Sequence, residues 1–87
     1  MDDESLLAQL ESVCRALGIK VRYEPCEEAP GGLCELRGER LVIVDDALPA
    51  ARRAAVLAAA LAELDTEGLY MPPAVRDLIE RQRPDRP

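Results

Sequence analysis

The sequence predicts one α+β domain, in which helices pack on a three-stranded, mainly antiparallel sheet in the order α-β-β-β-α-α. Three observations support this: apolar residues at helical spacing, a two-residue alternation after the first helix, and two apolar runs around a glycine turn. The 87 residues suit a single domain and are too few for two hydrophobic cores. We therefore assign residues 1–83 to the domain and residues 84–87 to a flexible tail.

The first predicted element is a helix over residues 5–17. Apolar residues three or four positions apart lie on one face of a helix. The members of this face are Leu6, Leu10, Val13, Cys14 and Leu17. Acidic residues at positions 2–4 precede the helix, where carboxylates accept hydrogen bonds from free N–H groups and favour the positive helix end. Gly18 then supplies a left-handed stop.

A strand follows, because apolar and charged residues alternate over residues 19–24. Pro25 ends the alternation. Residues 26–32 combine turn formers with charged residues, and this composition indicates a loop.

Two further predicted strands, residues 33–37 and 40–44, flank the pair Gly38-Glu39. A glycine at the first central position favours a type II′ turn, so we expect a tight antiparallel hairpin. The second of these strands is apolar on both faces over residues 41–44, as in a strand buried within a sheet. We therefore expect it in the centre of the sheet, with helices over one face.

The last two predicted elements are helices. Pro49 begins an alanine-rich helix that runs to about residue 65, because proline is tolerated in a first helical turn. The apolar seam of this helix consists of Val56, Leu57, Leu61 and Leu64, and that of the short final helix consists of Val75, Leu78 and Ile79.

The charge of the chain argues against nucleic-acid and membrane partners. The formal net charge is −6 and no run of Lys or Arg stands out, so phosphate backbones and anionic lipids find no complementary charge. The longest apolar stretch, residues 54–62, is far shorter than the roughly 20 residues of a membrane-spanning helix. The acidic start of the chain differs from the basic start of a signal peptide, and we expect the protein in the cytoplasm.

The three cysteines are expected to be reduced thiols. Cys14, Cys26 and Cys34 contain no C-x-x-C pair, and an odd number does not suggest a disulfide framework. Glu27 and Glu28 lie beside Cys26, and their carboxylates disfavour a reactive thiolate there. We expect Cys14 in the core.

Three strings of the sequence follow one another: LGIKVRYEP, then GGLCELRGERLVIVDD, then the proline-started PAARRAAVLAAALAEL. In this order they resemble the strand, hairpin and helix core of the ImmA/IrrE-type metallopeptidases, over residues 17–64. The resemblance implies a related fold. In that family the corresponding helix carries an H-E-x-x-H zinc motif.

The residues that would bind and activate zinc are absent from this helix. The resemblance places Ala59 and Ala60 where the first His and the Glu stand in the family, and Glu63 at the second His. Imidazoles at i and i+4 bind Zn²⁺, and the Glu accepts a proton from metal-bound water. Alanine can do neither, and the chain contains no histidine. The resemblance therefore implies a relative without peptidase activity, and we expect no catalytic residue, metal or cofactor.

Two other segments suggest a site. Asp45 and Asp46 end a strand, where paired carboxylates can bind Mg²⁺ or act as acid and base. A turn and a helix cap are the simpler explanation for both residues. The string Pro30-Gly31-Gly32 lacks the Lys-Ser/Thr and the following helix of a phosphate loop, and we reject that interpretation.

The segment around the start of the last helix is the candidate partner interface. Tyr and Met are enriched at interfaces, and here they precede a rigid proline pair. The candidate interface residues are Tyr70, Met71, Pro72, Val75, Leu78 and Ile79. In the alternative interpretation, this segment folds back to cover the sheet or the alanine-rich helix.

These observations favour a non-catalytic interaction or regulatory module that forms a homodimer or binds another protein. A domain of this size buries only about 60% of its unfolded surface, so self-association would add stability. One alternative is a small enzyme or ligand-binding domain that uses Asp45, Asp46, Glu63 or the cysteines. A second alternative is an antitoxin-like accessory protein.

Overall fold

The computed structural model describes residues 1–83, and the predicted tail, residues 84–87, lies outside the described part. The elements are α1 (Asp3–Ala16), β1 (Lys20–Glu24), β2 (Gly31–Leu36), β3 (Glu39–Asp45), α2 (Ala50–Leu61) and α3 (Pro73–Gln82). The α+β class and the predicted order of the elements are confirmed.

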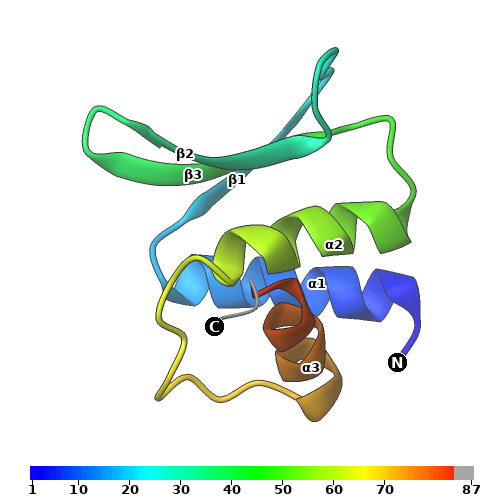
Figure 1. The fold of residues 1–87 in the computed structure, drawn as a ribbon, viewed down its shortest axis with the longest axis vertical. Helices are drawn as coiled ribbons and strands as arrows, with labels where there is room; N and C mark the ends of the chain where they lie inside the picture. The colour runs from blue at the N-terminus through cyan, green and yellow to red at the C-terminus, as the bar shows by residue number, and fades with distance from the viewer. Residues whose placement is uncertain (84–87) are drawn as a thin grey trace.

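The elements form layers, with the sheet on one side of the helices (Figure 1). Helices α1 and α2 pack against each other under one face of the sheet, α1 beneath β1 and α2 beneath β2 and β3. Helix α3 packs on α1 and α2, on their side away from the sheet. The opposite face of the sheet has no helix over it among the described residues.

The sheet is mixed, which corrects the predicted mainly antiparallel arrangement. Its strand order is β1-β3-β2, with β1 parallel to β3 and β2 antiparallel to β3. The predicted central position of residues 41–44 is confirmed. The chain reverses direction between β1 and β2 and again between β2 and β3, so the neighbours β1 and β3 run in the same direction.

The hairpin turn differs from the predicted type II′ turn at Gly38-Glu39. Leu36 pairs with Glu39, so the two turn residues are Arg37 and Gly38. Both have positive φ, 55° and 82°, and this combination defines a type I′ turn. The predicted loop is also shorter at its end, because β2 already begins at Gly31.

The N-terminus of α1 is capped as the acidic residues predict. Asp2 accepts a hydrogen bond from the backbone N–H of Ser5 at 2.8 Å. This bond stabilises the carboxylate and lowers the pKa of Asp2. At the other end, Gly18 adopts a φ of 74°, the left-handed conformation expected of a helix stop.

Helix α2 ends at Leu61, four residues before the predicted end, and arginine side chains bind the backbone that follows. The last carbonyl groups of a helix have no partner within the helix. Arg83 donates to the carbonyl oxygen of Ala62 at 2.7 Å, and Arg76 donates to that of Leu69 at 2.8 Å. The connection between α2 and α3 is therefore held by two side chains of the C-terminal segment.

One hydrophobic core joins the sheet to all three helices. Its fully buried members include Leu10 and Cys14 of α1, Val42 and Val44 of β3, and Leu57 of α2. The predicted burial of Cys14 is confirmed. Because β3 buries Val42 and Val44 towards the helices, Leu41 and Ile43 lie on the opposite face of the sheet.

Candidate interaction site

The structure divides the six predicted interface residues into three groups by exposure. Met71, Val75 and Ile79 are buried in the core, with exposed fractions of 6%, 0% and 0%. Pro72 and Leu78 are half-buried, whereas Tyr70 is 92% exposed. The three buried side chains are not available to a partner, because Val75 and Ile79 of α3 and Met71 before it lie in the core.

The carboxylates considered for catalysis lie apart. Asp45 and Asp46 precede α2, whereas Glu63 follows it, and this 12-residue helix is about 18 Å long. Asp45 accepts a hydrogen bond from the backbone N–H of Ala47 at 3.1 Å, which is a turn contact. The geometry therefore does not bring these carboxylates together in one cavity.

The cysteines occupy three different environments. Burial, followed by the charge of Glu11, raises the pKa of the Cys14 thiol to about 11. Burial and the nearby carboxylates, Asp45 foremost, raise the pKa of the half-buried Cys26. Cys34 is exposed on β2. Within residues 1–83, no three Cys, Asp or Glu side chains lie close enough to hold a metal ion.

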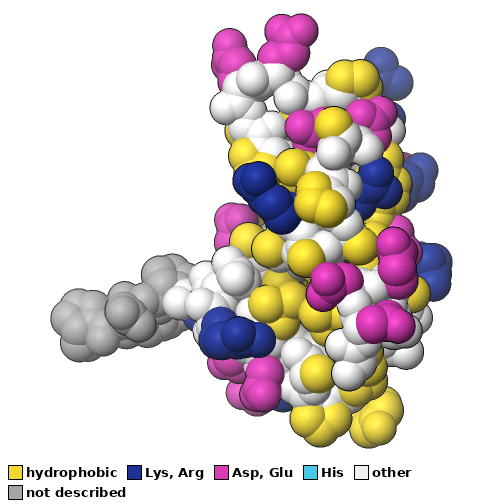
Figure 2. All heavy atoms as spheres, turned by 90° about the vertical axis from the view of Figure 1, so that its right-hand side faces the viewer, with side chains coloured by type: hydrophobic (Ala, Val, Ile, Leu, Met, Phe, Trp, Pro, Cys, Tyr) yellow, Lys and Arg dark blue, Asp and Glu magenta, His cyan; other side chains and the backbone are white. Residues whose placement is uncertain are grey.

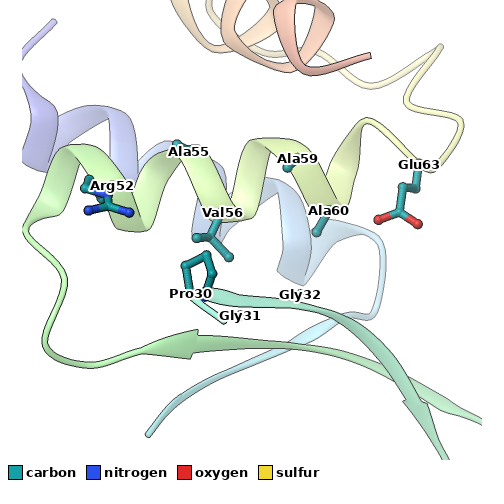
Figure 3. A pocket seen from close by; sticks show the side chains of 9 residues that line it. All are labelled: Pro30, Gly31, Gly32, Arg52, Ala55, Val56, Ala59, Ala60 and Glu63. Carbon is teal, nitrogen blue, oxygen red and sulfur yellow. The ribbon is translucent and has the colours of Figure 1, made fainter. Parts of the chain in front are cut away.

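A groove between α2 and β2 is the candidate interaction site (Figure 3). It has a volume of about 310 Å³, and its floor and walls are mainly apolar. Its lining residues are Pro30, Gly31, Gly32, Arg52, Ala55, Val56, Ala59, Ala60 and Glu63. We name this side of the molecule, formed by these residues and the free edge of β2, the α2–β2 flank.

The side chains of α2 give the groove an apolar centre and charged ends. Figure 3 shows Arg52 at one end and Glu63 at the other, with the side chain of Val56 directed at the ring of Pro30. Ala59 and Ala60 contribute only methyl groups between these points. The positions at which the resemblance places the zinc motif therefore line this groove.

The edge of β2 beside the groove is unpaired. Asp45 donates its backbone N–H to the carbonyl oxygen of Pro30 at 2.9 Å, so Pro30 is bonded to β3. Alternate residues of an antiparallel strand bond to the same neighbour, so Gly31, Leu33 and Glu35 direct their backbone groups away from β3. Within residues 1–83, no strand pairs with this edge.

Figure 2 shows the charge distribution on the face where α1 and α2 begin. Acidic and basic side chains alternate there with hydrophobic ones, and no large area carries a single sign. Such a surface gives a phosphate backbone no continuous positive track.

The sequence alone did not identify this groove. In the sequence, its α2 residues indicate a helix and occupy the positions of a missing zinc motif. The groove itself depends on where β2 lies in the fold, which these residues do not determine. The detectable signal was the exposed face of the alanine-rich helix, where only Arg52 and Glu63 are charged among the lining residues.

Comparison with known proteins returns no match: no family model, no curated protein and no solved structure resembles this chain at a significant level. In the described part of the chain, every helix is too short or too polar to cross a membrane.

Proposed function

We propose that this chain is a non-catalytic protein-interaction module that binds its partner along the α2–β2 flank, in the cytoplasm. The observation that carries the proposal is the unpaired edge of β2 beside an apolar groove. A partner segment in extended conformation can add to such an edge, so that its backbone forms hydrogen bonds while its side chains enter neighbouring pockets.

The two edges of the sheet support the choice of β2. Edge strands that must remain free are commonly protected by charged side chains or proline. β1 carries Lys20, Arg22 and Glu24 within five residues and is followed by Pro25. β2 carries only Glu35 within six residues and contains no proline. Pro30 and Arg37 flank β2 in the sequence, but the strand itself carries fewer charged side chains than β1.

The groove supplies the apolar contact that backbone hydrogen bonds lack. A typical intramolecular hydrogen bond contributes only about 0.5–1.5 kcal/mol net, because it replaces a bond to water. Burial of apolar area contributes about 25 cal/mol per Å². The methyl groups of Ala55, Val56 and Ala59 provide such area next to the edge.

The proposal assigns no reaction to the groove. Ala59 and Ala60 can neither bind a metal ion nor transfer a proton, and Glu63 has no second carboxylate among the lining residues. The resemblance to metallopeptidases, where it implies a non-catalytic relative, agrees with this interpretation.

An arginine in the groove tests the proposal. Ala59→Arg places a long cationic side chain at an exposed groove position of α2, and Ala51→Arg makes the same change at an exposed position of α2 outside the groove. Partners cross-linked to the purified chain in extract, including other copies of the chain, are identified by mass spectrometry. We expect the Ala59→Arg variant to lose the partners that the Ala51→Arg variant retains.

Hydrogen exchange gives a second readout on the same complexes. The outward-facing backbone N–H groups of Leu33 and Glu35 should become protected when the partner binds. Partners that survive Ala59→Arg, or a complex in which these two N–H groups exchange as fast as in the free chain, would refute the proposed binding mode.

A further inference from the structure

The groove residues of α2, together with Glu63 just beyond its end, occupy symmetric positions. These residues are Arg52, Ala55, Val56, Ala59, Ala60 and Glu63. Their positions are symmetric about the midpoint between residues 57 and 58. An antiparallel copy of α2 related by a two-fold axis through this midpoint would place Val56 opposite Ala59. The same operation places Arg52 opposite Glu63.

The charges at the two ends are therefore complementary to a copy of the same helix. Arg52 and Glu63 are both exposed, and neither forms a salt bridge within residues 1–83. A two-fold axis uses each pair twice, so one dimer would contain two Arg52–Glu63 contacts across the interface. A parallel arrangement would instead bring like charges together.

The same arrangement compensates for the unfavourable charges at the ends of α2. A helix favours acidic groups near its N-terminus and basic groups near its C-terminus. α2 has no acidic residue in its first turn and no basic residue in its last turn, and Arg52 lies in that first turn. In an antiparallel pair, Glu63 of the second copy lies beside the N-terminus of α2 and Arg52 of the second copy beside its C-terminus.

Small side chains in the centre permit the close approach that the pairing needs. The distance between packed helix axes is about 8–10 Å and falls with the size of the side chains at the contact. The central contacts here involve Val56, Ala55 and Ala59, whereas Ala60 is 2% exposed and lies in the core. Beside them, Gly31 and Gly32 of β2 have no side chains to obstruct a second molecule (Figure 3).

We infer that the partner at the α2–β2 flank is a second copy of this chain, docked by a two-fold axis with α2 antiparallel to α2 and Arg52 paired with Glu63. This inference rests on the proposed function only for the location of the flank, since a second copy docked through α2 packs a helix there and adds no strand to β2. It excludes a heterologous protein as the main occupant of the flank.

Charge reversal tests the pairing directly. Arg52→Glu leaves two acidic residues at the contact, and Glu63→Arg leaves two basic ones, so each variant alone should dimerise at least about ten-fold more weakly. Light scattering and sedimentation equilibrium over a concentration series measure the dimer Kd. Both changes favour the end of α2 where they occur, so the folded monomer should keep its thermal stability.

Two restorations make the test specific. In a heterodimer of the two variants, residues 52 and 63 carry opposite charges at both contacts, with the native pair at one and the reversed pair at the other. An equimolar mixture should therefore recover the dimer. The double variant R52E/E63R should recover the homodimer. Failure of either restoration, or dimerisation that neither single change weakens, would overturn the inference.

A third outcome separates this inference from the proposed function. If the unaltered chain remains a monomer at several hundred micromolar while Ala59→Arg still abolishes capture of another protein, the flank is an interaction site for that protein. The homodimer would then be wrong and the proposed function would stand.

Discussion

The hydroxyl group of Tyr23 on β1 donates a hydrogen bond to the carboxylate of Glu11 on α1. The guanidinium group of Arg53 on α2 lies over the same ring, 5.1 Å from its centroid. One aromatic side chain thus joins the edge strand of the sheet to both helices beneath it. Burial, followed by the bond to Glu11, raises the pKa of Tyr23.

Removal of this hydroxyl group should weaken the fold by about 1–2 kcal/mol, since a bond to a charged acceptor is lost and Glu11 remains half-buried. The change is Tyr23→Phe, which keeps the ring beneath Arg53. Urea denaturation measures the free energy of unfolding. Tyr70→Phe is the matched control, because Tyr70 is 92% exposed and should leave that free energy unchanged. Equal effects at both positions would contradict a role for the bond.

The free energy of unfolding should fall as the pH rises from about 9 to about 11. The Cys14 pKa rises from 9.0 to about 11 in the folded state, so the unfolded chain loses this proton first. The stabilisation is complete below pH 9 and is lost as the pH passes the folded-state value. Ionisation of Tyr23 in the unfolded chain adds to the loss above pH 10.

Denaturation at a series of pH values checks this dependence. Cys14→Ala should lower the stability at neutral pH, because it leaves a small cavity, yet it should flatten the decline between pH 9 and 11. Cys34→Ala, at an exposed thiol, should retain the decline. An unchanged slope in Cys14→Ala would show that another group is responsible.

Gly31→Ala should destabilise the domain by about 2 kcal/mol or more. Gly31 has a φ of 137°, and an added Cβ would lie 2.0 Å from the carbonyl oxygen of Ile43. Gly32→Ala is the control, since a Cβ there meets no atom within 4 Å. Thermal unfolding of the two variants compares them. A Gly31→Ala variant as stable as Gly32→Ala would refute the close approach of β2 to β3.

Ile79→Ala should cost about 2–5 kcal/mol, as is usual for a fully buried aliphatic side chain. Tyr70→Ala should leave the stability unchanged, because the Tyr70 side chain is exposed. Chemical denaturation of both variants distinguishes a core role for α3 from an interface role. A stable Ile79→Ala monomer that no longer binds its partner would support the interface interpretation instead.

The sequence predicted those features of the fold that follow from a local residue pattern. The apolar run of residues 41–44 predicted a central strand, and β3 does have a neighbouring strand at both edges, although the helices of residues 1–83 cover only one face of the sheet. The antiparallel prediction failed although it placed residues 41–44 in the centre of the sheet, because it did not follow the direction of the chain. The chain reverses between β1 and β2 and again between β2 and β3, so β1 is parallel to β3.

The site could not be predicted in the same way. The spacing of Val75, Leu78 and Ile79 indicates an apolar helix face, but the spacing is identical whether that face covers its own core or a partner. The groove requires β2 to lie beside α2, and these elements are separated by β3 in the sequence. Contacts of this kind arise from tertiary packing, and the spacing of apolar residues along the sequence does not predict them.

The mixed sheet also determines an order of assembly. The hairpin joins residues close in sequence, such as Leu36 and Glu39, whereas every β1–β3 pair, such as Lys20 with Leu41, closes a longer segment. Closure of longer segments costs more chain entropy before any contact compensates for it. The hairpin should therefore form within the folding nucleus, and β1 should dock after it. Substitutions in β1 would then accelerate unfolding more than they slow folding.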